Sequence, residues 1–187
     1  MKIELNREFC LEVLKEYTKS ESLLKHAYAV EACVKYYAKK LGEDELYWGN
    51  VALLHDFDYE KYPTMEDHPA KGAEILKEKG FEEEFISAIL SHADYTGVPR
   101  DTQLKRILFA CDELAGFITA VALVRPSKSI DEVQVKSVKK KMKDKGFSKA
   151  VSREDIKKGA EEVNLELDEH ILNCIEAMKL EKELLEL

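Results

Sequence analysis

Histidines and aspartates form the most chemically suggestive pattern in the chain, which has 187 residues and five histidines. His55 is followed directly by Asp56, and a second aspartate, Asp112, stands in the apolar segment LFACDELAGF. Imidazole and carboxylate ligands together suit a divalent ion such as Mn, Fe, Co, Ni or Zn. The candidate metal ligands are His26, His55, Asp56, His68, His92 and Asp112. We expect the fifth histidine, His170, to be a surface or packing residue.

Helical periodicity dominates the sequence, so we expect an all-α fold. Asn6, Ser20 and Asp44 are expected to cap helices, and Gly42 is expected to end one. Most of the candidate ligands then fall at or near helix ends, where several helices could converge on one point. The expected helices span about 7–18, 21–41, 45–55, 68–79, 82–92 and 102–124.

The run Arg125-Pro126-Ser127 is the best internal boundary. Beyond it we expect a basic helix in SVKKKMKDKG, a helix that starts near Ser152, and a last helix that runs from about Asp168 to the end. No repeat or low-complexity linker is present. We therefore expect one domain over residues 1–187, with a core at about 20–125 and a C-terminal helical extension at about 126–187 that packs on it.

The His55-Asp56 pair could bind metal because adjacent residues at a helix end can both turn toward one ion. Asp56 has two oxygens and could bridge two ions. Such a pair could lower the pKa of a bridging water toward ~7 and supply hydroxide as the nucleophile.

The order of these residues resembles the HD superfamily of metal-dependent phosphohydrolases, over about residues 20–125. The resemblance rests on His26, then ALLHDFDYEKYP, HPAKGAEIL, AILSHADYTG and LFACDELAGFI. It implies an HD-domain helical bundle whose basic ligand set is His26, His55, Asp56 and Asp112. It also implies that His68 and His92 match the added ligands of dinuclear members, such as the HD-GYP phosphodiesterases and the bacterial diadenosine tetraphosphate hydrolases. We therefore favour two ions over one.

The chain departs from the pattern HDIGK that many relatives show. Here Phe57-Asp58-Tyr59 follows the dyad, and no lysine appears before Lys61. The chain also lacks the GYP signature. It looks like a set of small HD-domain proteins described only as predicted hydrolases, a resemblance that supplies no substrate.

Further residues could take part in catalysis or in substrate binding. Besides Asp56, we expect Glu113 and Asp58, and less strongly Asp94, to orient a ligand or a water or to act as a general acid. Tyr59, Tyr62 and Tyr95 could line a base or sugar pocket, or serve packing alone. Candidate phosphate-binding residues are Lys61, Arg125, Lys128, Lys140 and Arg153. The basic run at 136–145 is either a solvated helix face or a phosphate-binding segment.

Composition and charge indicate which classes of partner and which compartment to expect. The net charge of −8 makes nucleic acid an unlikely partner, because backbone binding needs a basic footprint. The first residues carry charges without an apolar core, and no apolar stretch is long enough to span a bilayer. We therefore expect a cytoplasmic protein without a membrane partner. The four cysteines are scattered without a CxxC pair, and we expect Cys33 and Cys111, which sit among apolar residues, to be reduced core residues.

Taken together, these features predict hydrolysis of a phosphate ester or anhydride in a small, nucleotide-like substrate. Two alternatives remain open: a metal-containing helical module that senses a nucleotide without hydrolysing it, and an oxygenase with a di-iron centre.

Overall fold

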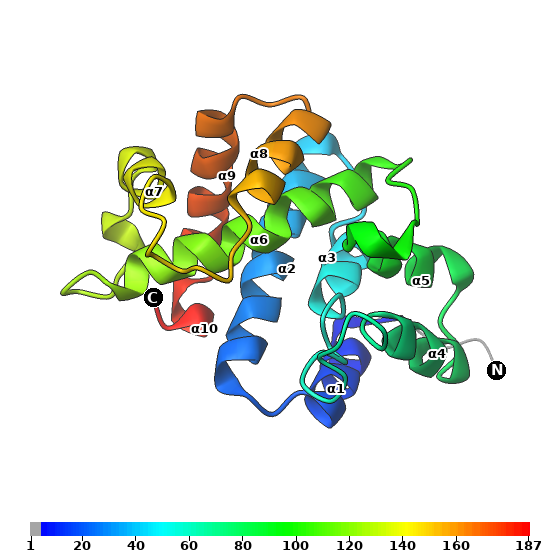
Figure 1. Cartoon of the computed structure of the whole chain (residues 1–187). Helices are drawn as coiled ribbons and strands as arrows, with labels where there is room; N and C mark the ends of the chain where they lie inside the picture. Colours follow the sequence, from blue (N-terminus) through cyan, green and yellow to red (C-terminus); the bar gives the residue numbers. More distant parts are fainter. Residues whose placement is uncertain (1–4) are drawn as a thin grey trace.

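A computed structural model describes residues 5–187, and within them all regular secondary structure is helical (Figure 1). The all-α prediction is confirmed, with C-terminal helices packed on the first part of the chain. The α-helices are α1 (Arg7–Tyr17), α2 (Glu21–Leu41), α3 (Glu45–Leu53), α4 (Ala70–Glu78), α5 (Glu83–Leu90), α6 (Gln103–Leu123), α7 (Val135–Met142), α8 (Arg153–Glu162), α9 (Leu167–Leu180) and α10 (Lys182–Leu185). Short 3₁₀ turns, η1 (Asp94–Thr96) and η2 (Ile130–Glu132), lie in the connections.

The ends of the helices are defined by local side-chain and backbone contacts. The side chain of Asn6 accepts the backbone N–H of Phe9, and the side chain of Asp44 accepts those of Leu46 and Tyr47. Gly42 ends α2 at a φ of 74°, in the left-handed region that a glycine adopts without strain. Ser20 occupies the expected N-cap position of α2, but its side chain makes no capping hydrogen bond and instead contacts Ser22.

The two longest helices, α2 and α6, form the centre of the core. Helix α2 packs against α3, α6 and α9, and α8 packs against α6. The contact between α6 and α8 is very close, because a Cβ added at Gly159 would lie 2.6 Å from the Cα of Ala110. His170 of α9 is buried here and binds the Tyr37 hydroxyl and the carbonyl oxygen of Ala110, which fits the packing role expected for it.

Three of the predicted helices are shorter than expected, and four of the candidate ligands lie in the turns next to their shortened ends. Helix α3 stops at Leu53, α4 starts at Ala70 and α5 stops at Leu90. The backbone N–H groups of His55 and His92 bond to carbonyls three residues back, which tightens the chain out of α-helical geometry. The predicted last helix is also divided, into α9 and α10.

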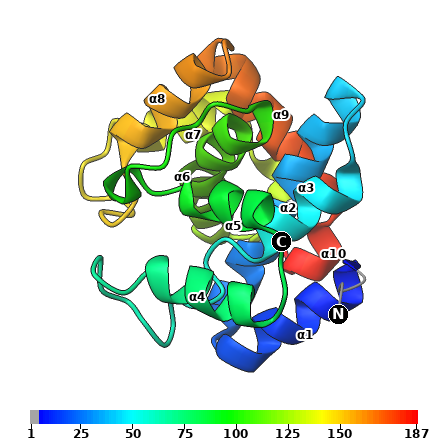
Figure 2. The same cartoon turned by 90° about the vertical axis from the view of Figure 1, so that its right-hand side faces the viewer.

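Figure 1 places α7 at the left end of the molecule and α4 at the right, and Figure 2 shows α4 turned toward the viewer. No helix among the described residues is long and apolar enough to cross a membrane.

Candidate metal centre

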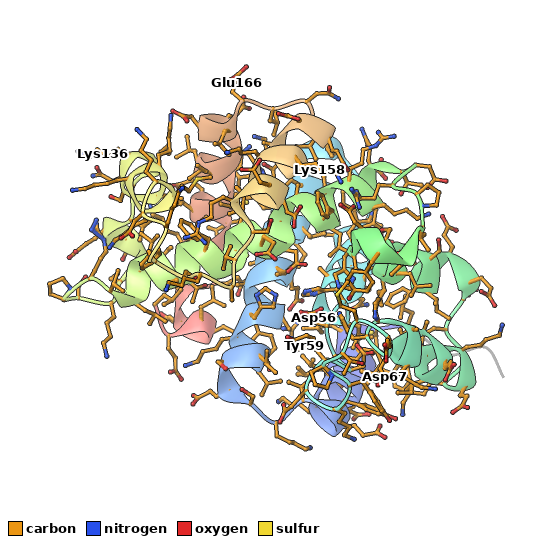
Figure 3. All side chains as sticks on the ribbon, viewed as in Figure 1. Asp56, Tyr59, Asp67, Lys136, Lys158 and Glu166 are labelled. Carbon is orange, nitrogen blue, oxygen red and sulfur yellow. The ribbon has the colours of Figure 1, made fainter. Side chains whose placement is uncertain are left out.

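The six predicted ligands come from five separate parts of the chain and meet at one place. His26 extends from α2 and Asp112 from α6, while the other four lie in the turns after α3, before α4 and after α5. Figure 3 shows Asp56 in the middle of the molecule, beside α2 and α3. Their ligand atoms form two groups that could each hold an ion, one of His26, His55, Asp56 and Asp112, and one of Asp56, His68 and His92.

The first group surrounds two carboxylate oxygens. The Nε2 atoms of His26 and His55 lie 3.1 and 3.4 Å from Oδ1 of Asp112. The same two atoms lie 3.8 and 3.5 Å from Oδ2 of Asp56. The ligand atoms of these four residues therefore face one point.

The second group uses the other oxygen of Asp56. Oδ1 lies 3.1 Å from Nε2 of His68 and 3.2 Å from Nε2 of His92. The two imidazole nitrogens are 3.3 Å from each other. Since its two oxygens face different sets of histidines, Asp56 is placed to be shared between two ions.

Three of the four histidines have a partner that directs the other ring nitrogen. Nδ1 of His55 lies 2.7 Å from the Ala52 carbonyl oxygen, and Nδ1 of His92 lies 2.7 Å from that of Ile89. A carbonyl only accepts, so Nδ1 carries a proton in both rings, and Nε2 is the nitrogen left to bind a metal. The turns that end α3 and α5 thus orient these two ligands.

His68 is oriented by a carboxylate instead. Oδ1 of Asp58 lies 2.8 Å from Nδ1 of His68, and Oδ2 accepts the backbone N–H of Gly72 at 2.8 Å. Asp58 is completely buried. A Cβ on Gly72 would lie 2.7 Å from the carboxyl carbon of Asp58, so only glycine leaves room for this contact. Both oxygens are in use, which favours an orienting role over direct contact with a substrate.

Opposite charges shift the pKa values across the centre. Burial opposes protonation of His55, but the charges of Asp56 and Asp112 outweigh it and raise its pKa to about 9. Burial also opposes protonation of His68, but hydrogen bonds to Asp56 and Asp58 raise its pKa to about 9. The histidines in turn hold the pKa values of Asp56 and Asp112 below the usual range, despite burial. The carboxylates of Asp56 and Asp112 thus favour a positive charge beside them, from a protonated imidazole or from a cation.

The donors fit a divalent transition ion. Nε2 of His55 is buried without a hydrogen-bond partner, although it faces two carboxylates at 3.4 and 3.5 Å. A buried nitrogen left in this state is what a metal ligand needs. All the ligand atoms are nitrogen or oxygen, which suits Mn, Fe, Co, Ni or Zn. The four cysteines are free and buried, as expected of reduced core residues.

The structure separates the other acidic candidates by their contacts. Glu113 accepts the backbone N–H of Ser152 at 3.0 Å, which ties the start of α8 to the helix that carries Asp112. Burial, followed by the charge of Asp112, raises the pKa of Glu113 to about 7. Asp94 pairs with Lys158 and Arg100, whose hydrogen bonds keep its pKa low despite some burial. A carboxylate held in that ionised state is a poor general acid.

Two of the three candidate tyrosines lie against the second group. The ring of Tyr59 meets that of His68 edge-on at 5.2 Å, and the Tyr95 hydroxyl donates to the His68 carbonyl oxygen. Both side chains remain 41 and 47% exposed. Tyr62 contributes no ring contact of this kind among the described residues.

The five predicted phosphate-binding cations are engaged elsewhere or lie outside the centre. Lys61 sits over the ring of Tyr17, and Arg125 donates to the carbonyl of Glu132. Arg153 donates to loop carbonyls and stacks on Phe117. Lys128 lies in the loop after α6, and Lys140 lies on α7. In the described part of the chain, none of the five forms an ion pair with the ligand carboxylates.

Comparison with known families identifies the segment that carries the six candidate ligands. The sequence model of the HD domain matches residues 23–116, which is just over half of the chain and spans every ligand from His26 to Asp112. No solved structure matches the chain with significance. The HD domain implies a hydrolase-type activity that depends on a divalent metal. The protein therefore belongs to the HD domain family.

Proposed function

We propose that the protein binds two divalent transition-metal ions and hydrolyses a phosphate ester or anhydride in a small, nucleotide-like molecule. The observation that carries this proposal is that the two carboxylate oxygens of Asp56 face different histidines. Oδ2 faces His26 and His55, while Oδ1 faces His68 and His92. When bound, two such ions would activate a water at near-neutral pH and offset charge on the phosphoryl oxygens.

The residues of the chain hold and orient this site. Asp56 and Asp112 bring two negative charges next to four imidazoles, and the carbonyls of Ala52 and Ile89 keep two of the rings in the metal-binding tautomer. Asp58 orients His68 in the same way. Catalysis on this scheme depends on positions that are set before substrate arrives.

The charge of the site supports a phosphate substrate that is bound mainly through the metals. Among the described residues, no lysine or arginine pairs with Asp56 or Asp112, so only histidines face these carboxylates with positive charge. Bound cations would add the positive charge that attracts a phosphate. The exposed rings of Tyr59 and Tyr95 next to His68 would then offer flat surfaces to a base or sugar.

The test is to quantify metals in the purified protein and then to screen phosphorylated metabolites with Mn, Co or Ni. We expect close to two ions per chain and hydrolysis of a nucleotide-like ester or anhydride, both lost in Asp56→Asn. A protein without transition ions, and without activity when they are added, would overturn the proposal. Tight nucleotide binding with equal inactivity of the native protein and Asp56→Asn would establish a sensor instead.

A further inference from the structure

A second cluster of charged side chains lies away from the metal centre. It surrounds a hollow of about 640 Å³ formed by α7, the loop after it, and the starts of α8 and α9. Six cationic side chains and a single acidic one, Glu154, line it. The cations are Lys139, Lys143, Lys145, Lys149, Arg153 and Lys157. This clustering is unusual in a chain whose net charge is −8.

Most of these charges have no neutralising partner. Lys139 pairs with Asp168, and Lys157 pairs with Glu154. Within the residues that the structure describes, Lys143, Lys145 and Lys149 have no carboxylate within ion-pair distance. Like charges that surround one concave surface raise its potential and attract an anion.

Arg153 provides a fixed positive charge beside this hollow. Its guanidinium donates to the carbonyls of Phe147, Ser148 and Val151, and it stacks on the ring of Phe117 with 4.6 Å between guanidinium carbon and ring centroid. These partners are neutral, so its charge remains. They also hold the loop in place, and the lysines are therefore presented from an ordered segment.

The cationic surface continues past α7. A neighbouring hollow of about 450 Å³ is lined by Lys136 and Lys140, by Lys139 and Lys143 again, and by one acid, Asp168. Figure 3 shows Lys136 projecting outward from α7. Two adjoining basic hollows that share lysines suit an anion with several charged groups in a row.

The larger hollow also has an apolar wall. Met142, Val151 and Leu167 contribute it, and all three side chains are partly buried. The hollow is open to solvent on one side, and an apolar wall beside cations suits a flat ring that carries phosphates. A long nucleic acid fits less well, because the rest of the protein is acidic.

We propose that this basic hollow binds a nucleoside triphosphate, with the base against Met142, Val151 and Leu167 and the phosphates among the lysines. None of the six metal ligands lines it. The nearest link is Ser152, which lies between Val151 and Arg153 and donates its backbone N–H to Glu113 on α6. The hollow is thus a second phosphate site that does not depend on the metal centre.

The test measures binding of the β,γ-imido analogue of ATP to the full-length protein by titration calorimetry. The variant K145E/K149E reverses two exposed loop charges, and K15E/K39E makes the same change in net charge at exposed lysines on other helices. We expect K145E/K149E to bind at least about tenfold more weakly, and the control to bind within about twofold of the native protein. Binding should also weaken as salt is raised, and AMP should bind far less tightly than the triphosphate.

Asp56→Asn separates this site from the metal centre. We expect it to retain binding that K145E/K149E weakens. The proposal is overturned if the native protein does not bind the analogue, if K145E/K149E binds as the native protein does, or if all binding disappears with Asp56→Asn. Tighter binding of a single-stranded oligonucleotide than of the triphosphate would replace the nucleotide with a nucleic acid.

Discussion

The carboxylate of Asp58 is bound on both sides, by Nδ1 of His68 at 2.8 Å and by the backbone N–H of Gly72 at 2.8 Å. In the HDIGK pattern that the sequence resembles, this position is glycine. Asp58 has a structural use here, because it supplies the partner that orients a candidate metal ligand.

Replacement of Asp58 by asparagine should weaken the second metal position selectively. The amide is nearly isosteric but lacks the negative charge that favours the Nδ1–H tautomer of His68. We expect affinity for the second ion, and hydrolytic activity, to fall about 10- to 100-fold. Metal titration and steady-state kinetics measure both. Asp67→Asn, in the same connection between α3 and α4, is the matched control and should change neither; an equal loss in both variants would show a general effect on this connection.

Removal of a ligand from one group, compared with removal of the ligand that both groups share, should distinguish two ions from one. His92→Ala removes a ligand only from the group of Asp56, His68 and His92, so we expect it to bind one ion where the native protein binds two. Asp56→Asn should lose both, because its oxygens face both groups. Elemental analysis after dialysis gives the counts. Native protein that holds one ion, unchanged by His92→Ala, would refute a dinuclear centre.

The sequence indicated the six candidate ligands because histidines are few and because their order with Asp56 and Asp112 resembles that of the HD superfamily. It also predicted the helical fold, since periodicity and caps such as Asn6 and Asp44 are local signals. The helix ends at Leu53 and Leu90 were placed two residues too late. They depend on hydrogen bonds of His55 and His92 that periodicity does not reveal.

The sequence alone did not predict which separate segments contact each other. The pairing of Asp58 with His68 depends on the backbone of Gly72, although the glycine in HPAKGAEIL was a visible signal. The predicted phosphate-binding role of Arg153 considered its charge alone, whereas the structure commits its guanidinium to loop carbonyls and to Phe117. The charge of a side chain follows from its residue type, but its hydrogen-bond partners depend on the fold.

The stability of the metal-free protein should fall as pH rises from 6.5 to 9. His55 and His68 each have a folded pKa of about 9, raised above the ordinary value of 6.5. Stabilisation by their protons is therefore complete below pH 6.5 and is lost as pH rises through 9, which leaves Asp56 and Asp112 without nearby positive charge. Thermal unfolding in EDTA measures the decline. Protein loaded with Mn should show a smaller decline over this range, and equal slopes with and without metal would contradict the account.

The close contact between α6 and α8 allows a test of how tightly α8 must pack on the helix that carries Asp112. Alanine at Gly159 gains about 0.5–1 kcal/mol of intrinsic helix stability, but its Cβ would lie 2.6 Å from the Cα of Ala110, and forcing such a contact costs about 1–3 kcal/mol. Because the obstacle is backbone, the cost should prevail and Gly159→Ala should destabilise the protein. Gly49→Ala is the comparison variant: its nearest neighbours, at 2.8 and 2.9 Å, are Cγ and Cδ of the Lys35 side chain rather than backbone. Urea unfolding should therefore show a larger loss of stability at position 159 than at position 49. Gly159→Ala with native stability would mean that α6 and α8 can separate at little cost, and that the C-terminal helices do not constrain the position of Asp112.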